Sequence, residues 1–510
     1  MMENIDYDLR SIQEARELAR KGKIAANEIA NYNEEQIDRI LKNMVRVAEE
    51  NKVCLAKMAV EETGFGKVED KTYKNHMAST MVYEAIKDMK TIDIIDEDIE
   101  NKIISIAEPM GLVMGIVPST NPTSTAIFKA IIAIKSRNAI VFSPHPAALK
   151  CTTEAIRLMH DAAVAAGAPQ NIISSITTPS MEATNELMTH KDVAVIIATG
   201  GPGMVKAAYS SGKPALGVGA GNSPAYIEKT ANVEKAVKNI IASKTFDNGT
   251  ICASEQSVIV EECNKDQVIA EFKKHNCYFM TEDETKKVCE LLFKNGHAMN
   301  AKFVGRDPQV IADAAGISIP EGTKLLIGEQ KGVGDGYPLS FEKLTTVLAF
   351  YTVKDWHEAC ELSYELLQNG LGHTMNIHTE DRDMVMKFAK KPASRILVNT
   401  GGSQGGTGAC TGLLPSFTLG CGTWGGSSVS ENVGPMHLVN IKKVAYGTKD
   451  CTIAEDNSSL NCTTNCSCNY ESPAFYAARS AVNNECHDKC DDDKLMKLMS
   501  EFMEVMKGAN

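Results

Sequence analysis

Hydrophobic positions recur at helical spacing through the first sixty residues, and the period then changes. Stretches such as IDRILKNMVRVAEENKVCLAKMAVEETG predict long amphipathic helices over residues 8–60, because apolar residues three and four positions apart share one helix face. Gly64 ends that pattern, as glycine commonly does after a last helical turn. Between Thr91 and Pro109 apolar and polar residues alternate around an acidic centre, which predicts a β-hairpin.

From Gly111 onward, short β-rich runs alternate with helical stretches. The runs are GLVMGIV, NAIVF at 138–142, VAVIIA at 193–198 and PAYIE at 224–228. Strands that are apolar throughout and alternate with helices indicate a parallel sheet covered on both faces. A second region of this kind follows Cys252, with LLIG, TTVLAFY and RILVN as strands and KDWHEACELSYELLQ as a helix. The pattern therefore predicts an α/β fold.

The chain changes character after about Tyr446. Residues 448–490 are polar and rich in Asn, Ser, Thr and Cys, which predicts a flexible linker. Residues 491–510 regain helical periodicity, with one apolar face made of Leu495, Leu498, Met499, Phe502 and Met506. Because an isolated helix this short is marginal in water, we expect it to fold against another surface.

Composition narrows the class of protein. A chain of 510 residues with 43% hydrophobic and 23% charged residues is typical of a globular protein of two or three domains. A formal charge of -12 argues against nucleic acid or an anionic membrane as the main partner. The sequence shows neither a secretion signal nor an apolar run of the ~20 residues that a membrane span needs. The fifteen cysteines are therefore expected to be reduced thiols in a cytoplasmic protein.

The stretch TFDNGTICASEQSVIV, residues 245–260, contains the one candidate nucleophile, Cys252. A helix over Val233–Ile241 ends at turn residues before it, and a buried strand begins at Ser257 after it. A thiol in such a loop is accessible while the flanking elements hold it in place. Its pKa must fall from ~8.5 for the thiolate to act. The alternative is a small core residue, as most free cysteines are.

The run FDNGTICASEQSV closely resembles the catalytic-cysteine segment of the CoA-acylating aldehyde dehydrogenases. Residues 415–447 resemble the closing segment of that family, and the resemblance covers about residues 8–447. It implies an aldehyde dehydrogenase fold, with a Rossmann-like cofactor domain, an α/β catalytic domain and a small oligomerisation arm. The corresponding ranges are 1–232 for the NAD-binding domain with an oligomerisation hairpin near 91–109, 233–430 for the catalytic domain, 431–447 for the closing strand, 448–490 for the linker and 491–510 for the terminal helix.

The resemblance assigns roles to two further catalytic residues. Asn121, in IVPSTNPTSTAIFKA, resembles the side-chain donor that holds the oxyanion together with the Cys252 backbone N–H. The alternative for Asn121 is an Asn-Pro turn. His373, in GLGHTMNIHT, resembles a histidine that assists deprotonation of the CoA thiol, for which its ordinary pKa of ~6.5 is suitable. The alternative is a structural histidine.

The cofactor implied by the resemblance is NAD, and NADP stays open. The turn ATGGPGMVKAA follows a strand and opens a helix, where backbone N–H groups approach a pyrophosphate. SPHPAAL resembles the loop that meets the adenosine ribose, and it lacks the acidic residue that would reject a 2′-phosphate. The residues expected to contact the cofactor are Pro118, Ser119, His145, Thr199, Gly200, Gly201, Gly219 and Glu342.

The run GKPALGVGAGNSP, residues 212–224, departs from the hydrolytic aldehyde dehydrogenases. Their ELGG-like sequence carries a glutamate that activates water, and Val218 occupies that place here. Because valine cannot act as a general base, the thioester on Cys252 should persist until CoA takes the acyl group. The alternative is that Val218 reflects only the packing of a tight glycine-rich turn.

The implied reaction is the reversible conversion of a short aldehyde, NAD and CoA to an acyl-CoA and NADH. Acetaldehyde is the leading substrate, with propionaldehyde, sulfoacetaldehyde and succinate semialdehyde as alternatives. Members of the family form homodimers or homotetramers. The chain lacks a match to the iron-dependent alcohol dehydrogenase half of bifunctional relatives, so the alcohol step is expected to belong elsewhere.

The tail leaves three interpretations open. Residues 491–507 resemble the encapsulation peptides that bind shell or cargo proteins of bacterial microcompartments, which would place the enzyme inside one. The helix could instead pack on its own domain. A metal site is the third, but the spacings of Cys462, Cys466, Cys468, Cys486 and Cys490 are not those of common zinc modules, and no metal is expected.

Overall fold

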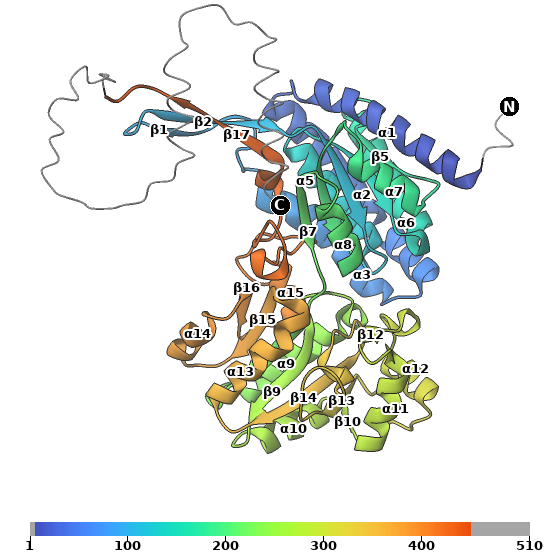
Figure 1. Cartoon of the computed structure of the whole chain (residues 1–510), viewed down its shortest axis with the longest axis vertical. Coiled ribbons are helices and arrows are strands. Elements are labelled where there is room, and N and C mark those ends of the chain that lie inside the picture. The colour runs from blue at the N-terminus through green and yellow to red at the C-terminus, as the bar shows by residue number, and fades with distance from the viewer. Residues whose placement is uncertain (1–5, 450–510) are drawn as a thin grey trace, which may run out of the picture. The chain divides into compact units, whose positions relative to one another are not determined.

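The computed structural model describes residues 6–449, and it begins with two long helices, α1 (Tyr7–Ile29) and α2 (Glu34–Thr63) (Figure 1). The long amphipathic helices expected over 8–60 are therefore these two, separated at residues 30–33. Asn33 explains the interruption, because it begins α2 with a capping box in which Asn33 and Gln36 bond each other's backbone N–H. Gly64 ends α2 in the left-handed conformation (φ 68°), as predicted.

The first parallel sheet has five strands in the order β5-β4-β3-β6-β7. Its strands are β3 (Leu112–Val117), β4 (Ala139–Pro144), β5 (Ile173–Ser175), β6 (Val193–Thr199) and β7 (Ala215–Val218). The helices around it are α3 (Val68–His76), α4 (Val82–Ile86), α5 (Pro122–Lys135), α6 (Leu149–Ala165), α7 (Met181–Thr189) and α8 (Pro202–Tyr209). The strand–helix alternation expected from Gly111 is confirmed here.

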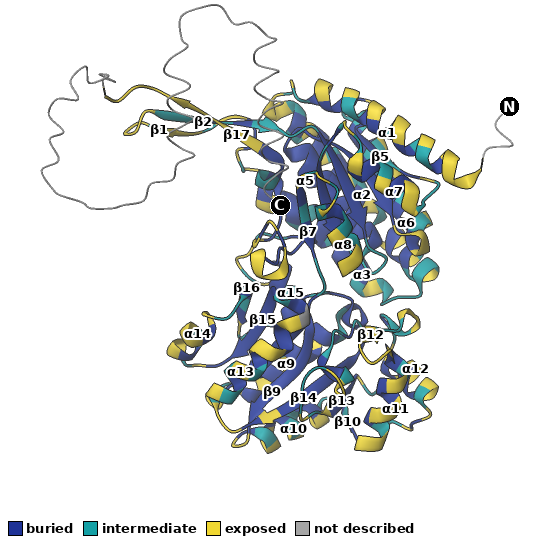
Figure 2. Ribbon diagram, in the orientation of Figure 1, coloured by how far each residue is buried: buried dark blue, intermediate teal, exposed yellow. Residues whose placement is uncertain are grey.

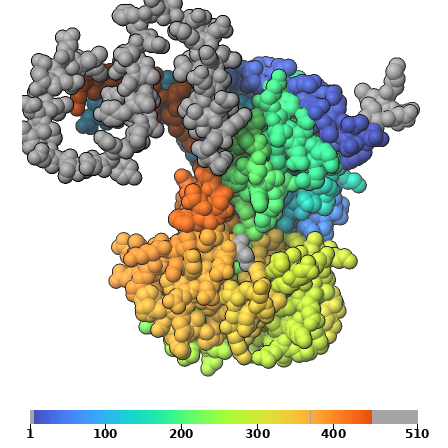
Figure 3. Space-filling model, in the orientation of Figure 1, coloured from blue at the N-terminus to red at the C-terminus, as the bar shows by residue number. Residues whose placement is uncertain are grey.

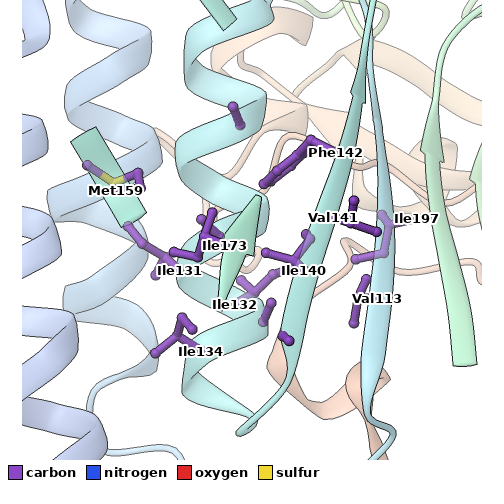
Figure 4. Close-up of a cluster of buried hydrophobic side chains, with 14 of the residues drawn as sticks. Val113, Ile131, Ile132, Ile134, Ile140, Val141, Phe142, Met159, Ile173 and Ile197 are labelled. Atoms are coloured by element: carbon purple, nitrogen blue, oxygen red, sulfur yellow. The ribbon is translucent and has the colours of Figure 1, made fainter. Parts of the chain in front are cut away.

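Burial of apolar side chains holds this region together. Every residue of β3, β4 and α5 is buried, which explains why their sequences show no polar face. Figure 4 shows part of this core, where Ile131, Ile132 and Ile134 of α5 lie beside Ile140 and other strand residues. Colouring by burial shows dark blue strands in this sheet, whereas the helices around it carry yellow stripes on their outer sides (Figure 2).

The second parallel sheet has seven strands in the order β10-β13-β14-β9-β8-β15-β16. The strands are β8 (Ser223–Ile227), β9 (Glu255–Glu261), β10 (Cys277–Met280), β13 (Leu325–Glu329), β14 (Val347–Val353), β15 (Gly372–His378) and β16 (Ala393–Val398). The helices are α9 (Val233–Thr245), α10 (Lys265–Lys274), α11 (Glu282–Leu292), α12 (Pro308–Ala315), α13 (Trp356–Leu367), α14 (Arg382–Phe388) and α15 (Gly402–Gly406).

Alternate residues of β14 belong to two different cores of this sheet. Leu348 and Phe350 pack with α9 and α10, whereas Val347 and Ala349 pack with α11, α13 and α14. Because successive side chains of a strand point to opposite faces, helices cover both faces of the sheet.

One strand lies in a different sheet from the one that its sequence position suggested. β8 precedes residue 232, the expected end of the cofactor domain, yet it pairs with β9 and β15 of the second sheet. The change of sheet therefore takes place between β7 and β8. The sequence PAYIE did not indicate this, because a short apolar strand fits equally well into either sheet.

A third, antiparallel sheet has the order β1-β2-β17 and joins distant parts of the chain. β1 (Asp93–Asp98) and β2 (Ile103–Pro109) form the hairpin predicted between Thr91 and Pro109. β17 (Val439–Ala445) pairs with β2 along its whole length. A short pair, β11 (Phe293–Lys294) and β12 (Ala298–Met299), completes the strands described.

The segment before β17 returns to the first sheet. The Ser428 hydroxyl donates to the carbonyl of Ala215 at 2.5 Å, and the Tyr209 hydroxyl donates to Ser427 at 3.2 Å. Figure 3 shows the orange surface of this segment beside the green surface of α8 and β7. The segment thus brings residues from the end of the described chain to the edge of the five-stranded sheet.

Within residues 6–449, the nine cysteines form no disulfide bond. That range contains no cluster of three or more His, Cys, Asp or Glu side chains arranged to hold a metal ion. None of its helices is long and apolar enough to cross a membrane. The predictions for the linker after residue 449, the cysteines at 462–490 and the terminal helix at 491–510 concern residues outside the described range.

Candidate active site

Cys252 lies in a loop between α9 and β9, half-buried at the wall of a cavity of about 250 Å³. The cavity is lined from the first sheet by residues at the ends of β3, β6 and β7, and from the second by the loop that carries the cysteine. Phe417 and Leu419, from the segment before β17, also line it. The candidate nucleophile thus faces the loops of both sheets.

The turn before Cys252 has an unusual backbone. Asp247, Asn248 and Gly249 are consecutive residues with positive φ, at 48°, 51° and 76°. The left-handed region costs a non-glycine residue roughly 1–2 kcal/mol, and Asn and Asp tolerate it best. Gly249 has a second reason, because a Cβ there would lie 2.7 Å from the Thr345 carbonyl oxygen. The DNG sequence therefore matches a strained turn that other contacts must hold.

Asp247 supplies those contacts from a fully buried position. Its carboxylate accepts hydrogen bonds from Lys71 at 2.8 Å, Lys74 at 2.5 Å and the Thr250 hydroxyl at 2.7 Å. Its backbone N–H donates to Asp70 at 2.8 Å. Although burial opposes the charge, the two ammonium groups hold the pKa of the Asp247 carboxyl below its ordinary value. Helix α3 thereby anchors the loop that carries the candidate nucleophile, Cys252.

The substitution Asp247→Asn is expected to lower the free energy of unfolding by about 3 kcal/mol. It leaves the ammonium groups of Lys71 and Lys74 buried without a carboxylate, and breaking a buried pair typically costs ~3–5 kcal/mol. Urea unfolding at neutral pH measures the difference. The native pKa is lowered, so this stabilisation is present above the unfolded pKa of about 3.9 and is lost as the pH falls below it.

The matched control is Asp283→Asn, which removes a carboxylate that pairs with Lys287 on the exposed surface of α11. Exposed pairs contribute little, so urea unfolding should not change measurably. Equal unfolding midpoints for Asp247→Asn and Asp283→Asn would contradict the anchoring role of the buried carboxylate.

Asn121 is the residue immediately before α5, and its amide is held in one orientation. Lys74 donates to Asn121 Oδ1 at 2.6 Å, and Asn121 Nδ2 donates to the Thr250 carbonyl at 3.0 Å. Because an ammonium group can only donate, the carbonyl end of the amide must face Lys74. The NH₂ end consequently faces the loop of Cys252, where an oxyanion donor would be needed.

Cys252 forms a close pair with His373 on β15. The distance from Cys252 Sγ to His373 Nε2 is 3.1 Å, and His373 is fully buried behind the sulfur. Burial, with a smaller effect of Arg395, holds the pKa of His373 well below its ordinary value. Burial also raises the pKa of Cys252 to about 12, and Glu342 adds to the rise while Arg395 opposes it. Catalysis therefore requires groups that stabilise the thiolate.

The glycine-rich turn lies where β6 ends and α8 begins. Thr199 is the last residue of β6, and Gly201 precedes α8 without any side chain in the described chain capping the helix. A Cβ added at Gly201 or Gly219 would meet no atom within 4 Å, so both backbones border open space. Free N–H groups at a helix N-terminus beside such space fit a pyrophosphate, and the site therefore fits a dinucleotide.

The remaining expected cofactor residues lie on the same cavity. Pro118 and Ser119 follow β3, and His145 follows β4 with its Nδ1 accepting the Ala147 N–H at 3.1 Å. Glu342 accepts the Gly221 N–H at 2.9 Å, and burial raises the pKa of this carboxyl to about 7. The carboxyl ends of parallel strands thus converge on one edge, as they do in dinucleotide-binding sheets.

Val218 ends β7 and also lines the cavity, with its side chain 2% exposed. Of the described residues at the cavity wall, Cys252, His145 and Glu342 are the titratable ones, and none is Arg or Lys. The wall around the nucleophile is therefore largely uncharged, with hydroxyl groups from threonines and apolar surface from Ile251, Leu344 and Leu419.

Comparison with known proteins decides the family. The sequence profile of the aldehyde dehydrogenase family matches residues 5–302, more than half of the chain. The chain belongs to the aldehyde dehydrogenase family. An acetylating aldehyde dehydrogenase from Geobacillus thermoglucosidasius is 55% identical, with a TM-score of 0.86 over 88% of this chain and 99% of that chain.

Two curated relatives of this aldehyde dehydrogenase have different lengths. The succinate-semialdehyde dehydrogenase (acetylating) of Clostridium kluyveri is 41% identical over 86% of this chain and 97% of its own length. The bifunctional aldehyde-alcohol dehydrogenase AdhE of Escherichia coli (strain K12) is 49% identical over 85% of this chain. The present chain spans 50% of the length of AdhE.

The structure of this aldehyde dehydrogenase brings together the residues singled out in the sequence. One cavity is lined by Cys252, Asn121 and all eight expected cofactor residues. His373 does not line this cavity but contacts the sulfur of Cys252. Sequence reasoning missed the buried Lys71 and Lys74, because lysines three residues apart on a polar helix read as a solvated face.

Proposed function

We propose that this aldehyde dehydrogenase is CoA-acylating and converts a short aldehyde, NAD and CoA reversibly to an acyl-CoA and NADH. The observation that carries the proposal is the cavity wall around Cys252, where Val218 stands in place of a water-activating glutamate. The names of the relatives from G. thermoglucosidasius and C. kluyveri, both called acetylating, agree with it.

In the first half-reaction, Cys252 Sγ adds to the aldehyde carbonyl and forms a thiohemiacetal. The developing oxyanion is placed to accept hydrogen bonds from Asn121 Nδ2 and from the Cys252 backbone N–H. Lys74 keeps the Asn121 amide in the orientation that this donation requires. Gly201, Gly219 and Glu342 would hold NAD, which would supply the two-electron acceptor for oxidation of the thiohemiacetal to a thioester on Cys252.

In the second half-reaction, the acyl group leaves Cys252 for a thiol. Hydrolysis requires a base that removes a proton from water, and the side chain of Val218 has no group that does so. The one carboxyl group at the described cavity wall, Glu342, is engaged with the Gly221 N–H. The thioester therefore persists until the CoA thiolate attacks it and restores the Cys252 thiolate.

The substitution Val218→Glu tests this account. We expect it to confer aldehyde oxidation without CoA, with free acid as product and a rate about 10²-fold above that of the wild type without CoA, as a general base typically contributes. NADH formation from acetaldehyde, with and without CoA, together with chromatographic analysis of the product, measures the change.

Val218→Gln is the matched control, because it has nearly the same shape as Val218→Glu and lacks the carboxylate. It should stay dependent on CoA. Rapid CoA-independent turnover by the wild type would overturn the proposed reaction, and CoA-dependent turnover by Val218→Glu would show that residue 218 does not decide between water and thiol.

Acetaldehyde is the substrate that the cavity favours. Succinate semialdehyde carries a carboxylate and sulfoacetaldehyde carries a sulfonate. The described wall of the cavity has no Arg or Lys to pair with either group. Propionaldehyde, which is also uncharged, is the alternative substrate. Values of kcat/KM for these four aldehydes rank them, and a preference for an anionic aldehyde would contradict the choice.

We further propose that the enzyme is a homo-oligomer and that its tail directs it to a microcompartment. The β-sheet formed by β1, β2 and β17 exposes apolar side chains at Ile94, Ile441 and Val444, which supports pairing with a second subunit. Light scattering of the full chain tests whether it forms an oligomer.

The targeting role of residues 491–507 rests on sequence alone. Co-purification with shell proteins, with and without residues 448–510, tests this role.

A further inference from the structure

His373 is connected to more than the sulfur of Cys252. Its Nδ1 lies 2.8 Å from the hydroxyl oxygen of Thr374, and that oxygen accepts a hydrogen bond from Arg395 Nε at 3.2 Å. Thr374 and Arg395 are direct partners across the parallel strands β15 and β16. All three residues are at most 3% exposed, so the contacts lie inside the protein.

The donor and acceptor groups of the three side chains fix the direction of each hydrogen bond. A guanidinium N–H can only donate, so the Thr374 oxygen is an acceptor toward Arg395. Its hydroxyl proton then needs an acceptor, and among the described residues the one atom within reach is His373 Nδ1. An unprotonated Nδ1 in a neutral imidazole leaves the ring proton on Nε2, the atom that faces Cys252.

We propose that Arg395 and Thr374 are positioning residues that set the tautomer of His373, so that its Nε2–H donates to the sulfur of Cys252 and stabilises the thiolate. The proposal deepens the acylating function and rests on Cys252 as its nucleophile. In this tautomer His373 has no free lone pair toward the cavity, so it supports the nucleophile and does not take the proton of the CoA thiol.

The positive charge of Arg395 also supports stabilisation of the Cys252 thiolate. Its other N–H groups donate to neutral oxygens, namely the carbonyls of His373 and Gly420 and the side chain of Asn432. No carboxylate of the described residues forms an ion pair with it. A buried cation bound only by neutral groups is costly unless an anion lies nearby. The ionisable groups that act on Arg395 are the thiols of Cys421 and Cys252, and Arg395 in turn opposes the rise in the pKa of Cys252.

The substitution Thr374→Val removes the hydroxyl that connects Arg395 to His373. Alkylation of Cys252 by iodoacetamide, followed by mass spectrometry of the peptide that carries it, reports the thiolate fraction without aldehyde or CoA. We expect Thr374→Val to raise the pH midpoint of alkylation by about one unit, which slows alkylation about tenfold at neutral pH. Thr374→Ser keeps the hydroxyl and should restore the wild-type midpoint.

Two controls separate this effect from a loss of packing. Thr152→Val removes another buried hydroxyl, which donates to the carbonyl of Ala148, the residue before α6, and should leave the midpoint unchanged. In a His373→Ala background, Thr374→Val should cause no further shift, because the two residues act in series. An unshifted midpoint in Thr374→Val, or an equal shift in Thr152→Val, would overturn the proposal. Failure of the wild type to form acyl-CoA would instead overturn the proposed reaction.

Discussion

Replacing Cys252 with alanine is expected to reduce acyl-CoA formation by a factor on the order of 10⁵–10⁶, which is the typical loss when a covalent nucleophile is removed. We expect this loss because Cys252 Sγ is the sulfur at the described wall of the cavity that Asn121 also lines. NADH formation with acetaldehyde and CoA measures the rate. Intact-protein mass spectrometry after incubation with acetaldehyde and NAD should show one added acetyl group in the wild type and none in Cys252→Ala.

The matched control is Cys263→Ala, at an exposed cysteine just after the far end of β9. Its rate and its acetylated mass should equal those of the wild type. An acetyl group on Cys252→Ala, or normal turnover by that variant, would show that another residue forms the thioester.

Replacing Asn121 with alanine is expected to lower kcat by about 10²–10³, with a much smaller change in KM, as the loss of one oxyanion donor typically does. The amide is oriented by Lys74 through a 2.6 Å hydrogen bond, so its NH₂ group is in place before the substrate arrives. The donor acts in both half-reactions. Pre-steady-state NADH formation measures its effect on the rate of the first of them.

Asn43→Ala serves as the control for Asn121→Ala. Asn43 is an asparagine on α2 whose amide also donates to a carbonyl, that of Ala162, far along the chain from the cavity residues. Its loss should leave kcat unchanged. A raised KM with normal kcat in Asn121→Ala would assign Asn121 to substrate binding, and the oxyanion role would be wrong.

The fold was predictable where the strands are continuously apolar. β3, β4 and β6 show such runs, and each is buried by helices on either side. The sequence pattern did not predict β15, because GHTMNIH contains four polar side chains and is typical of a loop. The structure nevertheless buries every residue of β15. Its polar groups serve the site, as His373 and Thr374 do, and a hydrophobic pattern cannot reveal a strand of that kind.

The site was predictable in its parts that are contiguous in sequence. The segment around Cys252 and the glycine-rich turn at Thr199–Gly201 can each be recognised from a few neighbouring residues. Lys74, Thr374 and Arg395 could not be recognised in this way. Each acts through a partner far along the chain or on another strand, and each belongs to a residue type that is ordinarily solvated.

The anchoring of Asp247 by α3 bears on the order of events during synthesis. Lys71 and Lys74 leave the ribosome more than 170 residues before the carboxylate that they hold. The strained DNG turn lacks these contacts until that carboxylate reaches α3, which also supplies Asp70 for the backbone N–H of Asp247. The Asp247 carboxylate therefore meets two lysines that are already translated, and the loop that carries Cys252 is anchored only when these two parts of the polypeptide come together.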